Sequence, residues 1–285
     1  MKSELESLLL RINEAVDRLP EPVLRAFIPA LQEAEAELRA ALVRLGLKGS
    51  DTFTAQQYRR ALVQLRQAQS RIRATNPILF DLLANNISHV SSNAIAHLQE
   101  ELVTFSKRYK GTLNDLAIDE SALIAHGERM LIPRFKGSAA RYAGGLFQDI
   151  KRQLAIGMLR GETFGEMTTR LARTAGLRNP RGAGPDEAAA GLFKKYRGWA
   201  NRLVRTEVIG AYNDQFHQAL KELNEDDGGY KMQWNAALDR RVCGICKDLD
   251  GQVAKLNEPF RGGYWRPPAH PNCRCALVAW HKDFK

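Results

Sequence analysis

The sequence predicts an α+β protein in which long helices precede a small antiparallel sheet and a cysteine-rich C-terminal loop. Three observations support this fold class. Strong helix formers dominate the chain as far as about residue 224. Two short segments, residues 230–234 and 275–280, have the pattern of strands. All four cysteines lie within residues 243–275, in a stretch that contains several Gly and Pro and few residues that build a core.

Residues 1–132 are expected to form a helical arm or bundle that binds other proteins. The first helix has its apolar face at Leu8, Leu9, Ile12 and Val16, which recur at helical spacing. Proline lacks an N–H and clashes with the preceding turn, so it ends helices. Breaks at Pro20 and Pro22, at Gly49 and at Asn76-Pro77 separate four expected helices, of which the last three cover residues 23–46, 55–74 and 76–109.

Residues 133–285 are expected to form a second domain that combines helices with the small antiparallel sheet. Its expected helices cover residues 138–160, 164–175 and 185–224. The composition of residues 176–185 predicts a loop between the second and third of these. Arg178 and Arg181 in this loop are interpreted as solvated, with contacts to phosphates as the alternative.

The net charge of +10 is unevenly distributed along the chain. Residues 1–130 are balanced, with 16 basic and 16 acidic residues. Residues 131–285 contain 26 basic and 16 acidic residues, and all four tryptophans lie in the same part. A basic domain favours a polyanionic partner. We therefore expect the second domain to bind double-stranded DNA without sequence preference, the alternative being a basic domain with no anionic partner.

No run of eighteen apolar residues occurs, so the sequence predicts no transmembrane helix and no membrane partner. The first residues, Met-Lys-Ser-Glu-Leu-Glu-Ser, lead into a charged amphipathic pattern. A signal peptide instead has a basic start and an uninterrupted apolar stretch. The chain is therefore expected to stay in the cytoplasm of the cell that makes it, or to travel inside a particle assembled there.

The cysteine cluster carries the sharpest chemical signal. Cys243 and Cys246 are three residues apart, and a tight turn between them can direct both sulfurs toward one tetrahedral ion. His270, Cys273 and Cys275 supply further donors, and the two cysteines share one face if the chain between them is extended. Five candidate ligands thus compete for four positions. Zinc fits a structural site of this kind best.

Three other interpretations of the cluster stay open. The four cysteines can be reduced thiols that only pack, or they can form disulfides after the host cell lyses. One of them can also be a nucleophile that His270 activates. A cluster in a cytoplasmic protein is more often a metal site than a disulfide framework, which favours zinc.

Several short motifs follow one another in a recognisable order. They are Gly-Glu-Thr-Phe-Gly-Glu-Met at 161–167, Arg205-Thr206-Glu207, Trp234, Asp239-Arg-Arg-Val-Cys243-x-x-Cys246, Leu249-Asp250-Gly251, and Pro267-Pro268-x-His270-Pro271-x-Cys273-Arg274-Cys275. In this order, residues 138–280 resemble the MuF-like (phage Mu F-like) head morphogenesis proteins of tailed bacteriophages. Residues 1–130 match no part of that pattern.

The resemblance implies a non-enzymatic minor head protein of the virion. Such proteins enter the procapsid in few copies during assembly in the host cytoplasm. They are similar to proteins that lie in the capsid interior near the portal and influence DNA packaging or ejection. The implied partners are therefore the portal protein and other head proteins. Some relatives carry a toxin domain behind the MuF-like domain, and none is expected here because the chain stops ten residues after Cys275.

The Arg205-Thr206-Glu207 motif falls within an expected helix. Arg205 and Glu207 are two residues apart and cannot pair on one helix face. We expect each to reach a different neighbour, with Arg240 or Arg241 as the partner of Glu207, and ordinary surface positions as the alternative. Trp234 and Trp265 are expected in the core.

Two enzymatic hypotheses compete with the structural one. A metal-dependent nuclease acting on phage or host DNA could use His270 beside Cys273, but it needs an activated water and an acidic cation site. No carboxylates pair with histidine at a convincing spacing, and Asp248 and Asp250 are interpreted as shaping the turn at Gly251. A NAD-consuming transferase is the other hypothesis, and no recognisable nicotinamide pocket supports it.

Overall fold

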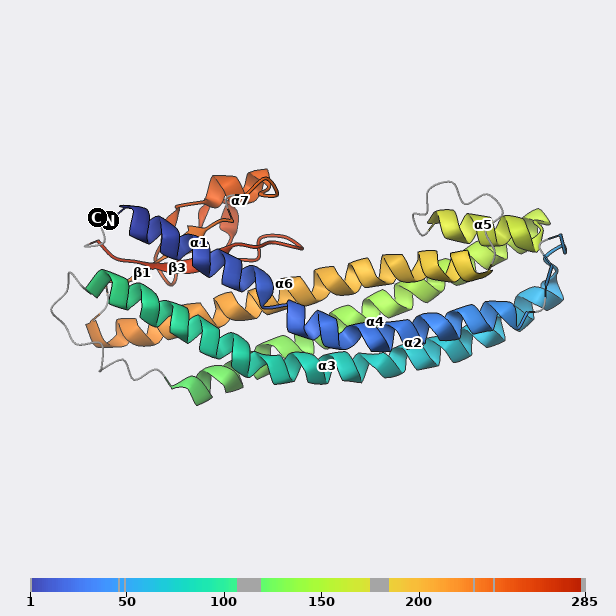
Figure 1. The fold of residues 1–285 in the computed structure, drawn as a ribbon, viewed down its shortest axis with the longest axis horizontal. Coiled ribbons are helices and arrows are strands. Elements are labelled where there is room, and N and C mark those ends of the chain that lie inside the picture. The colour runs from blue at the N-terminus through green and yellow to red at the C-terminus, as the bar shows by residue number, and fades with distance from the viewer. Residues whose placement is uncertain are drawn as a thin grey trace. The chain divides into compact units, whose positions relative to one another are not determined.

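The protein is described by a computed structural model that covers residues 2–45, 47–48, 50–106, 119–174, 185–227, 229–237 and 239–282. The expected loop at 176–185, with Arg178 and Arg181, lies almost wholly outside the described residues. Figure 1 shows helices followed by a small sheet, and this order confirms the predicted α+β class. The helices are α1 (Lys2–Arg18), α2 (Glu21–Val43), α3 (Ala55–Ser106), α4 (Glu120–Arg160), α5 (Phe164–Thr174), α6 (Pro185–Asp227) and α7 (Gly244–Leu249). The strands are β1 (Lys231–Asn235), β2 (Val253–Ala254) and β3 (Ala276–Trp280).

The helix boundaries agree with the sequence where proline begins or ends a helix. The chain breaks between α1 and α2 at Pro20, and α6 begins at Pro185. Two predicted boundaries are wrong, because α3 continues through Pro77 and α4 continues through Pro133. Proline removes one helical hydrogen bond, but its fixed φ is compatible with a helix, so a long helix can absorb it.

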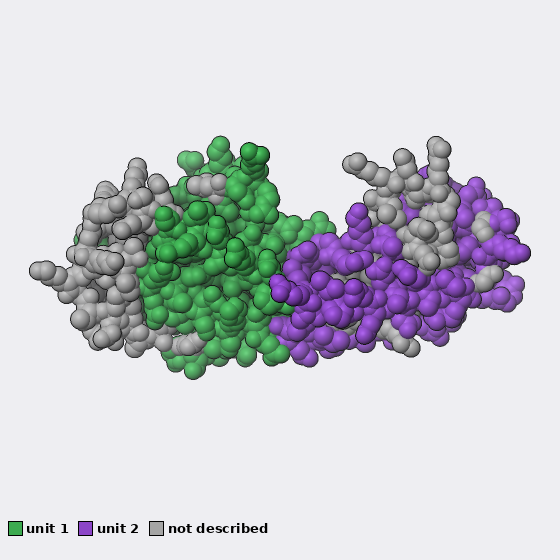
Figure 2. Space-filling view, in the orientation of Figure 1, with its two compact units in different colours: residues 1–23, 83–134, 202–285 green, residues 24–82, 135–201 purple. Residues whose placement is uncertain are grey.

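The chain forms two compact units, coloured separately in Figure 2. Unit 1 contains residues 1–23, 83–134 and 202–285, and unit 2 contains residues 24–82 and 135–201. Helices α3, α4 and α6 each contribute residues to both units. The boundary expected between residues 132 and 133 therefore falls inside α4, and each unit draws on both halves of the sequence.

The sheet of unit 1 has the strand order β2-β1-β3, with both pairs antiparallel. Met232 lies opposite Ala279, and Trp234 lies opposite Leu277. All four of these side chains are buried. The two segments that the sequence predicts as strands thus form the sheet, with β1 in the centre.

Helix α1 packs on this sheet through the apolar face that the sequence predicts. Leu8, Ile12 and Val16 are buried. The side-chain amide of Asn13 donates to the carbonyl oxygen of Ala236 at 3.3 Å, and that of Asn235 donates to the carbonyl oxygen of Leu9 at 3.3 Å. The first residues of the chain therefore belong to the same unit as the C-terminal sheet.

The outer edge of β3 is covered by side chains from two helices. Asn213 of α6 accepts from the Leu277 N–H at 2.6 Å and donates to the Cys275 carbonyl oxygen at 3.3 Å. Glu101 of α3 accepts from the Ala279 N–H at 2.7 Å. Exposed strand edges promote unwanted pairing with other chains. Buried polar side chains on α3 and α6 satisfy this edge instead.

Because of Glu101, we expect the stability of unit 1 to depend on pH. Burial raises the pKa of this carboxyl well above its ordinary value, so it stays protonated in the folded chain. Above the ordinary pKa the unfolded chain releases this proton and the folded chain keeps it, so the unfolding free energy falls as pH rises. We expect Glu101→Gln to reduce this fall in urea melts recorded between about pH 5 and pH 8. The exposed neighbour Glu100, which pairs with Arg11 at 2.7 Å, supplies the control Glu100→Gln. Equal pH slopes for Glu101→Gln and the parent chain would contradict the assignment.

In unit 2, the segments that precede α3 and α5 meet. The Phe53 N–H donates to the Glu162 carbonyl oxygen at 2.9 Å, and the Phe164 N–H donates to the Asp51 carbonyl oxygen at 2.8 Å. Thr163 caps α5, because its hydroxyl oxygen accepts from the Glu166 N–H at 3.3 Å and its own N–H donates to the Glu166 carboxylate at 2.8 Å. The Gly-Glu-Thr-Phe-Gly-Glu-Met motif thus begins a capped helix. Within the described ranges, none of the helices combines the length and apolar character that a membrane span needs.

Candidate metal centre

The Cys243-x-x-Cys246 motif forms the start of the short helix α7. Cys243 is its N-cap, and the Cys246 backbone N–H donates to the Cys243 sulfur at 3.4 Å. An N-cap side chain that accepts from the third following residue is the usual way to begin a helix. The cap holds both sulfurs on one side of the turn, as the spacing predicts.

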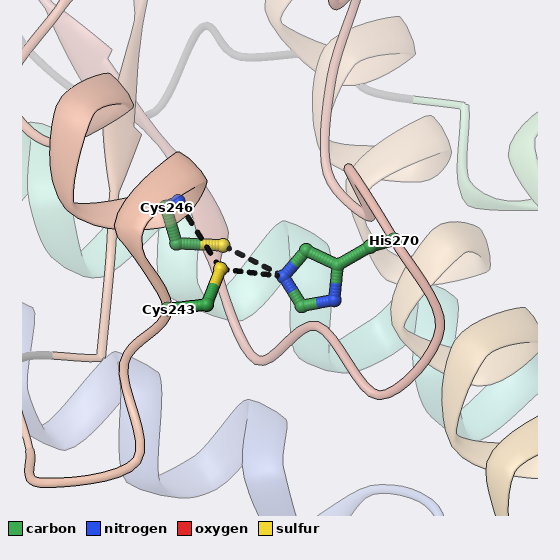
Figure 3. A group of neighbouring side chains, drawn as sticks. All are labelled: Cys243, Cys246 and His270. Atoms are coloured by element: carbon green, nitrogen blue, oxygen red, sulfur yellow. Dashed lines mark hydrogen bonds between the residues drawn. The ribbon is translucent and has the colours of Figure 1, made fainter.

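The His270-Pro-Asn-Cys273 segment forms a second turn that faces the first. The Cys273 N–H donates to the His270 carbonyl oxygen at 3.1 Å, and Asn272 has a φ of 63°. His270 Nε2 lies 3.1 Å from Cys243 Sγ and 3.1 Å from Cys246 Sγ, as Figure 3 shows. The donor atoms of Cys243, Cys246 and His270 all lie within 4.8 Å of one another.

Cys246 also belongs to a second group. Its sulfur lies 3.7 Å from Cys273 Sγ, and the sulfurs of Cys246, Cys273 and Cys275 lie within 4.8 Å of one another. All four cysteines are free thiols, and all but Cys243 are buried. The structure therefore brings the five candidate ligands of the sequence into two overlapping groups that could hold a metal ion.

The thiols in the cluster influence one another strongly. Hydrogen bonds from Cys246 and Cys275 lower the pKa of the Cys273 thiol. The same contact with Cys273 raises the pKa of the Cys246 thiol. For Cys243, burial opposes ionisation, but the N–H of Cys246 and the nearby His270 outweigh it and lower the pKa. Sulfurs this close cannot all ionise without a cation among them. A metal ion would supply that charge.

The turn after α7 is tied to the central strand. The Ala236 N–H donates to Asp250 Oδ1 at 2.8 Å, and the Gly251 N–H donates to the Trp234 carbonyl oxygen at 2.8 Å. Gly251 has a φ of +74°, a conformation that residues with a Cβ rarely adopt. Asp250, Gly251 and Trp234 thus fix the CxxC turn against the sheet.

Arg205 is linked to the first helix. Its guanidinium pairs with the carboxylate of Asp17 and donates to the Asp17 carbonyl oxygen at 3.2 Å. The same carboxylate lies 3.7 Å from Arg241, which also contacts Asp239 at 3.1 Å. Arg274 donates two hydrogen bonds of 2.6 Å to Asp239 and lowers the pKa of that carboxyl. Asp17 was missed by sequence reasoning, since only the fold brings it to a motif 188 residues away.

Thr206 connects helix α6 to residues 243–275, which carry the five candidate ligands and are called the metal-centre loop below. Its hydroxyl accepts from the Asn272 N–H at 3.1 Å and donates to the Arg202 carbonyl oxygen at 2.6 Å. Asn272 lies between His270 and Cys273, so this contact positions the second turn of the cluster. The middle residue of the Arg-Thr-Glu motif therefore contacts the candidate site directly.

The side chains named in the sequence analysis take the following positions. Arg241 pairs with Asp17 and Asp239, and Glu207 is buried in α6, so its suggested pairing with Arg240 or Arg241 stays a prediction. Trp234 is fully buried, as expected, but Trp265 is 54% exposed. Trp265 lies in the Gly- and Pro-rich segment before the second turn, where few apolar neighbours can cover a large ring.

The described groups that could hold a metal contain only cysteine and histidine. A hydrolytic centre of the nuclease type needs an open coordination position and a base that activates water. Asp250 is committed to the Ala236 N–H at 2.8 Å. In the part of the chain that the structure describes, nothing about this cluster favours nuclease chemistry.

Comparison with known proteins supports the resemblance seen in the motifs. Residues 148–278 match the model of the family described as "Phage Mu protein F like protein". The chain is also similar to the minor head protein GP7 of Bacillus phage SPP1, with 28% identity over 143 residues, which cover 47% of this chain and 40% of that protein. The chain thus spans well under half the length of this relative. No solved structure matches it. Residues 148–278, which include the candidate metal centre, are thus similar to the family of phage Mu F-like proteins.

Proposed function

We propose that this chain is a minor head protein of a tailed bacteriophage, built into the head during assembly and acting by binding. The observation that carries the proposal is the family match over residues 148–278, together with the similarity to a minor head protein of phage SPP1. The cysteine and histidine donors, of which Cys246, Cys273 and Cys275 are buried, are consistent with a structural role for the site, because a closed centre leaves no position for a substrate.

The cluster is proposed to hold a structural zinc ion. Thiolate and imidazole ligands suit zinc, and closed sites of this kind contribute directly to folding. The surrounding segment supports this role. Between β2 and β3 the described chain has only a short 3-10 turn at Arg261–Gly263, so little regular structure holds it together. A metal ion would compensate for the missing core.

The portal protein is the proposed partner inside the capsid, with other head proteins as further partners. Residues 1–132 supply long helices with balanced charge, and residues 1–23 and 83–132 lie in the same compact unit as the metal-centre loop. A helical surface of this kind is suited to protein contacts.

Co-purification tests this partner directly. We expect the full chain, co-expressed with the portal protein of the same phage, to elute with the portal ring in size-exclusion chromatography. A head-related protein of another phage, expressed in the same way, is the control for non-specific adsorption. If the chain elutes alone at every concentration, the portal is not its partner.

Packaged DNA is the second proposed partner, contacted without sequence preference. The excess of basic residues lies in residues 131–285. Among them, Arg240, Lys247 and Arg261 are exposed around the metal-centre loop. Exposed cations displace condensed counterions from the phosphate backbone, which makes binding favourable and dependent on salt.

Duplex binding is therefore expected to weaken steeply with salt. If about six phosphates are neutralised, affinity for an arbitrary duplex should fall roughly a thousandfold between 50 and 200 mM salt, measured by fluorescence anisotropy. Arg261→Gln should reduce the slope of log affinity against log salt by about one for each lost phosphate contact. The control is Arg274→Gln, because Arg274 is already paired with Asp239. A response that stays flat with salt would mean that the basic charge serves protein contacts.

A further inference from the structure

The cluster offers five donors for one tetrahedral ion, and the structure discriminates among them. We infer that Cys243, Cys246, His270 and Cys273 are the four ligands of a single zinc ion and that Cys275 remains outside as a buried thiol. This assignment rests on the proposed zinc centre and adds its ligand set. It also gives a reason for the two turns that face each other.

The first argument is the matching geometry of the two turns. Cys243 and Cys246 are separated by two residues, and so are His270 and Cys273. Each pair is closed by a backbone N–H of its last residue, which donates to Cys243 Sγ in one turn and to the His270 carbonyl oxygen in the other. Structural zinc sites commonly combine two such closely spaced pairs. Cys275 lies outside both turns.

The second argument is distance. Two sulfurs bound to one tetrahedral zinc at about 2.3 Å lie roughly 3.8 Å apart. The Cys246 and Cys273 sulfurs are 3.7 Å apart, which fits that spacing. Cys246 also belongs to the group with Cys243 and His270, whose donor atoms lie within 4.8 Å of one another. An ion bound by Cys243, Cys246 and His270 would therefore take its fourth ligand from the group that shares Cys246, and in that group the Cys273 sulfur lies at the fitting distance.

The third argument is the orientation of the histidine. His270 Nδ1 lies 2.9 Å from the Pro271 carbonyl oxygen. When Nδ1–H donates to that oxygen, Nε2 carries the lone pair, and Nε2 is the atom that faces Cys243 and Cys246 in Figure 3. A hydrogen bond to the far ring nitrogen is the usual way to fix the tautomer of a metal-binding histidine.

The position of Cys275 accounts for its exclusion. It immediately precedes β3, and its carbonyl oxygen accepts from the Asn213 side chain at 3.3 Å. The Leu277 N–H is bound to the same side chain at 2.6 Å. This double contact fixes the start of the strand against α6, so the backbone of Cys275 belongs to the strand and to neither of the facing turns.

The test compares Cys273→Ser with Cys275→Ser in the full-length chain. The two thiols are matched, because they are 1% and 2% exposed, so each substitution carries a similar packing cost. We expect Cys275→Ser to keep about one zinc per chain and Cys273→Ser to lose most of it, by elemental analysis after gel filtration. Zinc loss from both variants, or from Cys275→Ser alone, would overturn the assignment, as would zinc retained by both.

X-ray absorption of the zinc-loaded parent chain gives a second measurement that needs no variant. The assignment predicts three sulfur ligands and one nitrogen ligand, and a shell of four sulfurs would overturn it because His270 would then lie outside. A parent chain that purifies without zinc and takes up none when titrated would instead refute the proposed zinc centre itself. The two kinds of failure are thus distinguishable.

Discussion

Stripping zinc from the purified chain with a strong chelator is expected to unfold the region from β1 to β3. Zinc binding contributes on the order of 10 kcal/mol to the folding of small zinc-bound units. A typical domain has a total stability of about 5–15 kcal/mol, so this loss should unfold the region and not merely weaken it. The Asn272–Thr206 contact joins this region to α6, and the Arg274–Asp239 pair lies within the region, so both should open with it.

Hydrogen exchange measured by mass spectrometry follows this unfolding by segment. Peptides from residues 231–282 should lose protection on chelation, and peptides from α5 should keep theirs because α5 belongs to unit 2. Cys246→Ser supplies the control, since a chain that already lacks the centre should not respond further to the chelator. Unchanged protection of residues 231–282 in a chain shown to be free of zinc would contradict a structural role for the metal.

Truncation of Trp234 is the second change with a large expected effect. Its side chain is fully buried, with the Phe260 ring 5.3 Å and the Tyr264 ring 6.4 Å away between centroids. Trp234→Ala removes these contacts and leaves a large cavity, so we expect a loss of about 3–5 kcal/mol in chemical denaturation. Trp265→Ala is the matched control, because that ring is 54% exposed and its loss should change stability by less than about 0.5 kcal/mol. Similar losses for the two variants would contradict the assigned core.

The parts of the fold that the sequence predicts well are set by local patterns. The apolar spacing of Leu8, Ile12 and Val16 identifies the face of α1 that is buried. Alternation at residues 230–234 predicts β1 and the strand-like run at residues 275–280 predicts β3, although neither shows that β1 is central. The spacing of Cys243 and Cys246 predicts that both sulfurs point to one side, because a capped turn leaves the chain little choice.

The features that the sequence does not predict depend on contacts between distant segments. Pro77 and Pro133 suggest helix ends, yet both lie within long helices. The cost of proline in a helix is about 3 kcal/mol, which packing elsewhere along 52- and 41-residue helices can offset. The partner of Arg205 is Asp17, and no pattern near the Arg-Thr-Glu motif indicates a residue in the first helix.

The sequence also does not predict which residues make up each of the two compact units. A change in charge and tryptophan content near residue 131 suggests two consecutive domains. The compact units instead draw residues from both sides of that position, because α3, α4 and α6 are each long enough to enter both. The amino-acid composition of a segment indicates which kinds of partner it can bind. The length of its helices determines which segments of the chain lie in the same compact unit.

Quantitative mass spectrometry of heads purified from the phage or prophage that encodes this chain tests the central proposal most directly. The proposal predicts that the chain is present in few copies per head and stays with the heads through density-gradient purification and nuclease treatment. Heads that package DNA normally and contain none of the chain, with the protein found only in the soluble lysate, would contradict its assignment as a minor head protein.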